Sequence, residues 1–175
     1  LVTLEVLKLL RSTLPAGIEL RTRFAGDALD VLADSTQVHE VLVNLTTNAA
    51  HAIGRRPGAI TYVLESTAVD EVQAQAIPGL APGDYTRLSV IDDGCGMDAT
   101  TVERVFDAFY TTRPVGEGTG LGLSMVHGIM RSHGGAVTVD STPAVGSTFA
   151  LYFPVSAVPA RVAAPAAPAA AGPRR

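Results

Sequence analysis

Two glycine-rich stretches set the strongest constraint on how this chain folds. The first, Asp-Asp-Gly-Cys-Gly-Met at residues 92–97, follows an apolar segment, and the second, Gly-Thr-Gly-Leu-Gly-Leu at residues 118–123, opens an apolar helical pattern. Glycine at every second position lets backbone N–H groups come close to a ligand and adopt dihedral angles that other residues resist. A helix N-terminus also attracts anions, because its first N–H groups are unpaired and its dipole is favourable there. The second stretch therefore predicts a phosphate-binding helix N-terminus.

The composition indicates one modest domain with something attached to it. The chain has 175 residues, 47% hydrophobic and 17% charged, and can bury a single core. Its formal net charge of -4 provides no basic surface, so we expect no nucleic-acid partner. The single cysteine, Cys95, excludes an internal disulfide and suits a reducing cytosol. No apolar run could cross a bilayer and residue 1 begins no signal peptide, so we expect a cytoplasmic chain whose parent has any membrane anchor upstream.

The C-terminal residues have a different composition from the rest of the chain. Residues 155–175 are mostly alanine and proline without periodicity, a composition that cannot form a core. We therefore expect a folded domain at residues 1–154 and an extended linker or tail at residues 155–175.

Local patterns predict alternating helices and strands. A weak helical pattern covers residues 1–14, and alternation over residues 18–24 predicts a half-buried strand. Asp34 should cap a helix that ends at Gly54, with Gln37 completing a capping-box-like pair. Further strands are expected at residues 60–64 and 85–91, a surface excursion at 66–83, a helix at 120–132, and a hairpin of 136–140 with 148–153. This order predicts helices covering one face of a mixed sheet.

The helix expected over residues 34–53 carries two stripes. One is apolar and should pack on the sheet: Val38, Val41, Leu42, Leu45, Ala49 and Ile53. The other lies beside it, at steps of four, four and three residues: Glu40, Asn44, Asn48 and His51. Amide and carboxylate oxygens are ligands that Mg²⁺ takes when it also binds phosphate oxygens. From this helix alone the asparagines could equally be solvated surface residues, and a lone histidine is more often a surface or core residue than a phosphate donor.

Asp92 is the candidate for recognition of a base. It shares a strand face with Leu88 and Val90, so its carboxylate should point inward, where it needs a hydrogen-bond donor. The exocyclic amine of adenine would be such a donor. The alternative is a turn aspartate that bonds its own backbone ahead of Gly94. The glycine-rich helix start favours the nucleotide, and with the two asparagines upstream it predicts ATP.

Together these segments resemble the catalytic domain of sensor histidine kinases. The N, G1, F, G2 and terminal motifs of that family correspond, in order, to the asparagine helix, the turn at 92–96, Phe106 and Phe109, residues 118–123, and Gly146-Ser147-Thr148-Phe149. The similarity covers roughly residues 1–154 and is greatest to bacterial hybrid-type kinases, in which a linker and a receiver domain often follow. It implies the Bergerat ATP-binding fold, a two-layer α/β sandwich whose mixed, mostly antiparallel sheet is covered on one face by about three helices.

The resemblance also implies roles for individual residues. Asp92 would bind the adenine amine, with Thr148 helping through a water, and Asn48 together with Asn44 would hold Mg²⁺ against the phosphates. His51 stands where many of these kinases have lysine and would contact a phosphate. The backbone around the nucleotide would come from Gly94, Gly96, Gly118, Thr119, Gly120, Leu121 and Gly122.

A lid over the nucleotide is implied at residues 110–117. Phe106 and Phe109 would anchor its base, although ordinary core packing would explain them as well. Arg113 would meet a phosphate, or else is a flexible surface arginine.

The function implied is transfer of the ATP γ-phosphate to a histidine on a separate dimerisation domain, with a response-regulator receiver domain as a later partner. Hydrolytic relatives carry a water-activating glutamate four residues before the magnesium asparagine, and here that position is Asn44, which favours transfer to a protein over hydrolysis. None of the four histidines lies in the His-Glu context of a phosphoacceptor. Two alternatives are a nucleotide-binding pseudokinase module and a serine kinase of the anti-sigma-factor type.

Overall fold

The computed structural model describes residues 2–25, 31–114 and 118–155. The elements are, in chain order, α1 (Val2–Thr13), β1 (Ile18–Ala25), α2 (Ser35–Ile53), β2 (Gly58–Val69), α3 (Glu71–Ala76), β3 (Gly83–Asp92), α4 (Ala99–Arg104), α5 (Gly122–Ser132), β4 (Ala136–Thr142) and β5 (Gly146–Pro154). Of the tail expected at 155–175, only Val155 lies within the described residues, where it bridges to Val31. None of the helices described is long and apolar enough to span a membrane.

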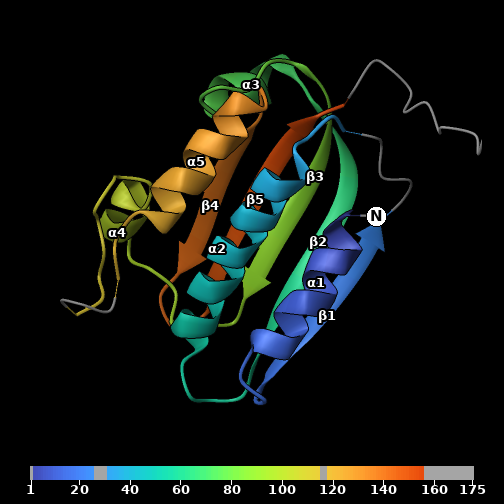
Figure 1. Ribbon diagram of the computed structural model, residues 1–175. Coiled ribbons are helices and arrows are strands. Elements are labelled where there is room, and N and C mark those ends of the chain that lie inside the picture. The colour runs from blue at the N-terminus through green and yellow to red at the C-terminus, as the bar shows by residue number, and fades with distance from the viewer. Residues whose placement is uncertain (1, 26–30, 115–117, 156–175) are drawn as a thin grey trace, which may run out of the picture.

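The strands form one mixed sheet in the order β1-β2-β3-β5-β4. β1 pairs with β2 in parallel, and the other neighbours pair antiparallel. Figure 1 shows α1, α2 and α5 lying side by side across one face of this sheet. The expected two-layer sandwich is confirmed, including its mostly antiparallel sheet and its three covering helices.

The core lies between the sheet and the three covering helices. The apolar stripe of α2 is buried as predicted, with Val41 and Leu42 fully inaccessible, and it packs on Leu88 and Val90 of β3. A buried hydrogen bond joins the hydroxyl groups of Thr46 and Tyr62 inside this core. Burial also raises the pKa of Tyr62 to about 12. The burial of α2 fixes its other stripe, with the two asparagines, at the edge of the core.

The two ends of α2 are defined by the residues expected to define them. The Asp34 side chain accepts hydrogen bonds from the backbone N–H groups of Thr36 and Gln37, at 2.8 and 3.2 Å. The Asp34 N–H in turn donates to Nε2 of His133 at the end of α5. Gly54 closes the helix with a φ of 73°, which glycine adopts at little cost. The reciprocal capping box is found at α3, between Asp70 and Gln73.

The surface excursion predicted at residues 66–83 is shorter than expected and contains a short helix. The hairpin ladder continues to the pair Val69 and Gly83, and α3 follows directly. Ile77 and Leu80 then pack on a small cluster on the other face of the sheet, formed by Val69, Tyr85, Ala150 and Tyr152. This burial anchors the segment.

The other boundaries differ by a few residues. The helix predicted from residue 120 begins at Gly122, and the three strands expected at 60–64, 85–91 and 148–153 are longer at their ends. β1 is half-buried only where it begins, at Ile18 and Leu20, because it is the edge strand and its later residues face solvent.

Candidate functional site

A cavity of about 460 Å³ opens between α2, the end of β3 and the start of α5. Its volume lies within the usual range for small-molecule sites. Ten of the predicted site residues line it: Asn44, Asn48, His51, Asp92, Gly96, Arg113, Gly118, Thr119, Gly120 and Gly122. Segments far apart in the sequence therefore meet at one site, as the motif order predicted.

Asp92, the last residue of β3, lines the cavity. It is 6% exposed, and its Oδ1 accepts a hydrogen bond from the Gly94 N–H at 2.8 Å. Burial raises the pKa of its carboxyl, and the N–H groups of Gly94 and Ser147 act against that shift. Asp92 bonds its own turn, as the alternative interpretation expected, and it also lines the cavity. A carboxylate accepts about four hydrogen bonds, so an amine donor can still be accommodated.

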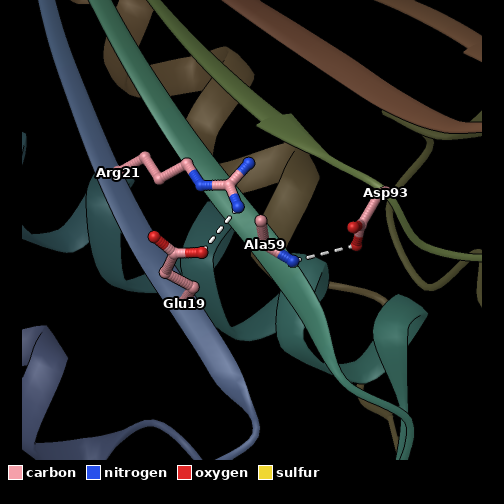
Figure 2. Close-up of polar contacts among 4 residues, drawn as sticks. All are labelled: Glu19, Arg21, Ala59 and Asp93. Carbon is pink, nitrogen blue, oxygen red and sulfur yellow. Dashed lines mark hydrogen bonds and ion pairs between the residues drawn. The ribbon is translucent and has the colours of Figure 1, made fainter.

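The neighbouring Asp93 side chain bonds the backbone of β2 and does not line this cavity. Figure 2 shows its Oδ1 accepting from the Ala59 N–H of β2, at 3.0 Å, on the side where Arg21 pairs with Glu19. The Arg56 guanidinium donates to the Asp93 backbone carbonyl. Asp93 is exposed and lines a second hollow, of about 370 Å³, on the face that the three large helices leave uncovered. The hydrogen bond of Asp93 to Ala59 joins the start of β2 to the end of β3.

The expectation that Thr148 assists Asp92 does not fit this geometry. Thr148 pairs with Ile91 across β3 and β5 and lines the hollow on the uncovered face. Ser147, which pairs with Asp92, is buried and lines the nucleotide-sized cavity. Because strand side chains alternate between faces, a shift of one residue moves the hydroxyl to the opposite side of the sheet.

Two further predicted residues do not line the cavity. Gly94 is buried directly behind it, where its N–H bonds Asp92. A Cβ at Gly94 would lie 2.6 Å from the Ala52 Cβ, so only glycine fits between α2 and the turn. Leu121 forms the N-cap of α5, and its side chain is exposed. Both residues shape the site from outside it.

The polar stripe of α2 reaches the cavity through two of its amides. Asn44 donates from Nδ2 to the Glu40 carbonyl, and a Cβ at Gly122 would lie 2.8 Å from its Oδ1, so this oxygen faces the start of α5. The Oδ1 of Asn48 accepts from the Arg113 guanidinium at 2.7 Å. His51 is exposed where it lines the cavity, and the lining residues do not include Glu40.

The start of α5 presents its backbone to the cavity. Gly120 has a φ of 65°, and a Cβ there would lie 2.4 Å from the Phe109 carbonyl carbon, so glycine is required. The Phe109 N–H donates to the Gly120 carbonyl at 2.8 Å. Leu121 offers no side-chain cap to the first turn of α5, which leaves N–H groups for an anionic ligand.

The cavity walls include residues to which the motif analysis gave no role at the site, among them Ser147, Phe149, Thr101 and Met97. Phe106 packs edge-on against Phe149 at the edge of the main core, which fits the alternative of ordinary core packing. The Phe109 side chain, in contrast, is 74% exposed, so core packing does not explain it. The Arg104 guanidinium stacks over the Tyr110 ring, 4.3 Å from its centre.

Alternation of side chains between the two faces of β5 is the sequence signal that would have identified Ser147 as a cavity residue. The tip of the predicted lid, residues 115–117, lies outside the described residues.

The donor set fits magnesium that is shared with a nucleotide. Within the described residues there is no group of three or more His, Cys, Asp or Glu side chains that could enclose a metal. Mg²⁺ is commonly held by one or two protein oxygens together with phosphate oxygens and waters. The amide oxygens of Asn44 and Asn48 beside the α5 N-terminus match that arrangement.

The sequence matches, over residues 33–157, the family model described as histidine kinase-, DNA gyrase B- and HSP90-like ATPase. The chain belongs to this ATPase family. Its fold is similar to the catalytic domain of histidine kinase ThkA, at 28% identity and a TM-score of 0.69 over 87% of this chain and 90% of that one. The match to a free-standing catalytic domain over nearly its full length identifies the chain as the ATP-binding catalytic domain of a sensor histidine kinase.

Curated relatives of this ATPase domain are bacterial sensor kinases. Sensor kinase CckA of Brucella abortus is 38% identical over 78% of this chain and 14% of its own length. Sensor histidine kinase ZraS of Escherichia coli is 37% identical over 79% of this chain and 26% of its own length. The chain therefore spans about a quarter or less of these two relatives. Full-length ShkA, solved in complex with AMPPNP, is similar at 27% identity and a TM-score of 0.66, over 87% of this chain and 29% of that one.

Proposed function

We propose that this domain transfers the γ-phosphate of ATP to a histidine on a dimerisation domain outside the chain, with Mg²⁺ held by Asn48 and Asn44. The observation that carries the proposal is the arrangement of one cavity. The cavity is lined both by a buried carboxylate, Asp92, and by residues at the N-terminus of α5, which has no side-chain cap. Adenine and phosphates have complementary chemistry to these two groups.

Binding residues follow from this orientation. Asp92 accepts from the adenine amine, and Ser147 replaces Thr148 as the hydroxyl beside it. The glycines of residues 118–122 allow the backbone to approach the phosphates, and Arg113 and His51 line the same cavity. When bound, Mg²⁺ neutralises charge on the phosphate oxygens. Phosphoryl transfer depends mainly on positioning and electrostatics, which such a frame provides.

Transfer is favoured over hydrolysis because the described lining of the cavity offers no carboxylate beside the phosphates. Within the described lining of the cavity, Asp92 is the one carboxylate, and it lies at the adenine end. Position 44, which faces the start of α5, is an amide that cannot take a proton from water. Without a base holding water in line, a protein acceptor is the better nucleophile.

The partners we propose are a histidine-bearing dimerisation domain and then a response-regulator receiver domain. ThkA, 25% identical with a TM-score of 0.66 over 89% of this chain and 40% of that one, was crystallised with the response regulator protein TrrA. The ATP-binding domain is assigned to residues 1–154 in the cytoplasm of a bacterium, and residues 155–175 to a linker. A hybrid kinase, with its receiver beyond that linker, is favoured by the alanine- and proline-rich composition.

A transfer experiment tests the proposal. The chain is incubated with γ-labelled ATP, alone and with the separately expressed dimerisation domain of its parent kinase. We expect negligible self-labelling, and slow labelling of the added domain that is acid-labile and lost when its histidine is replaced. Acid-stable label on a small partner protein would favour a serine kinase, and ATP binding without any transfer would favour a pseudokinase.

A further inference from the structure

The Asn48 amide oxygen, the atom proposed to bind magnesium, already has a cationic partner. The Arg113 guanidinium donates to it at 2.7 Å, across 65 residues of sequence. Both side chains are partly buried and both line the ATP cavity. A hydrogen bond from a cation to an amide oxygen is stronger than one between neutral groups. The contact therefore competes with any metal at this position.

Arg113 makes further contacts through its backbone and its side chain. The Arg113 N–H donates to Thr111 Oγ1 at 3.1 Å. Its side chain lies against Gly118, where a Cβ would come within 3.1 Å of Arg113 Cδ and 2.9 Å of Thr111 Oγ1. The glycine-rich segment and the Asn48 amide thus define one position for Arg113.

Sharing of this oxygen by magnesium and Arg113 is energetically unfavourable, because both are cations. A Mg²⁺ ligand distance is about 2.1 Å, which with the 2.7 Å hydrogen bond would leave the metal at most about 4.8 Å from the guanidinium nitrogen. Charges of the same sign at that separation repel, most strongly in a partly desolvated site. Phosphates that arrive with the metal offer Arg113 a new partner a short distance away.

We infer that Arg113 and Mg²⁺ are alternative occupants of the Asn48 oxygen, so that arrival of the metal–nucleotide complex releases Arg113 for a phosphate. Nucleotide without metal leaves Arg113 on Asn48. The inference rests on the proposed role of Asn48 as a magnesium ligand. On this inference, the contact between Arg113 and a phosphate forms only when magnesium is bound.

Arginine side-chain NMR tests this directly. The protein is labelled with ¹⁵N-arginine, and the Arg113 guanidinium signal is assigned from its loss in Arg113→Met. In nucleotide-free protein, Asn48→Ala should move this signal to the position of an exposed arginine. ADP with a chelator should leave it near its starting position, and ADP with Mg²⁺ should move it. ADP is the probe because it lacks the γ-phosphate.

Affinity supplies an independent readout. Calorimetry gives the ratio of ADP affinity with Mg²⁺ to ADP affinity with chelator. Arg113→Met should lower this ratio about threefold to tenfold, because it removes the phosphate contact that Arg113 makes only with Mg²⁺ and leaves binding with chelator nearly unchanged. Arg131→Met, which removes an exposed arginine of α5 outside the cavity, should leave the ratio unchanged.

Two results would overturn the inference. One is an Arg113 signal that Asn48→Ala does not move, because the contact would then be absent in solution. The other is an equal displacement by ADP with and without Mg²⁺, because phosphate alone would then be the competitor. Failure of ADP to bind at all would refute the proposed function and the inference with it, whereas binding with either of those two results refutes the inference alone.

Discussion

Replacement of Asp92 by asparagine separates ligand recognition from folding. Asparagine keeps an oxygen that can accept from the Gly94 N–H, so the turn after β3 should persist. On the proposed role of Asp92, the substitution removes one charged hydrogen bond to the adenine amine, worth about 1.5 to 3 kcal/mol. At 1.4 kcal/mol per factor of ten, Asp92→Asn should weaken ADP binding roughly tenfold to hundredfold.

Calorimetry on wild type, Asp92→Asn and Asp93→Asn provides the assay. Asp93 is the matched control, since it is an adjacent carboxylate whose Oδ1 bonds the Ala59 N–H outside the ATP cavity. GDP is a second probe, because guanine presents a carbonyl where adenine presents the amine. Wild type should prefer ADP strongly, and Asp92→Asn should lose most of that preference. Equal affinities for wild type and Asp92→Asn, or an equal loss in Asp93→Asn, would refute the assignment.

The pH dependence of the same site has a definite sign. Burial raises the pKa of the Asp92 carboxyl above its ordinary value of 3.8. The folded protein therefore holds this proton more tightly than the unfolded chain, and the contribution of Asp92 to stability declines as pH rises from about 3.8 through the raised pKa. ADP affinity should change in the opposite direction, since the amine donates best to the ionised carboxylate. Stability and affinity curves that Asp92→Asn leaves unchanged would contradict this account.

The remaining predictions concern the metal, the hydroxyl beside Asp92 and the lid. Asn48→Ala should weaken ADP binding with Mg²⁺ far more than with chelator, and equal losses would make Asn48 structural. Ser147→Ala should weaken ADP binding several-fold and Thr148→Ala should not, because only the former side chain lines the cavity. Chymotrypsin should cut after Tyr110 in nucleotide-free protein and be blocked by an ATP analogue with Mg²⁺; trypsin is unsuitable because proline follows Arg113. Cleavage that ignores nucleotide would argue against a lid.

The parts of the fold that sequence predicted well are those with a strong local period. The apolar stripe of α2, the asparagines beside it and the inward face of Leu88, Val90 and Asp92 all follow from helical or strand spacing. The caps at Asp34 and Gly54 were predicted because their chemistry acts within a few residues.

The errors arose where distant contacts decide the structure. Residues 66–83 look like a loop because of their proline-glycine pairs, yet pairing with β3 and burial of Ile77 and Leu80 hold them against the sheet. Phe109 looks like a core residue by type. Its N–H is instead fixed by the Gly120 carbonyl, and its positive φ of 67° leaves the ring exposed. No local pattern encodes either result.

The site itself was predictable as a set of motifs but not as a set of contacts. The bond between Arg113 and Asn48 joins two motifs whose spacing says nothing about their relative position. Gly94 and Leu121 were assigned to the nucleotide because they belong to the glycine motifs, and both act from outside the cavity. A motif names the segment that forms a site, while tertiary packing selects which of its atoms face the ligand.

The pleat of β3 and β5 decides that selection at the adenine end. Asp92 and Asp93 are adjacent, and so are Ser147 and Thr148, yet in each pair one residue lines the ATP cavity and its neighbour lines the hollow on the uncovered face. Asp92 and Ser147 line both hollows, because β3 ends and β5 begins between them. The carboxylate on the helix side is free to serve a ligand because its neighbour joins β2 to β3 through the Ala59 N–H. Asp93→Ala, which removes the oxygen that accepts from the Ala59 N–H, should accordingly lower stability with little effect on ADP affinity, the reverse of Asp92→Asn.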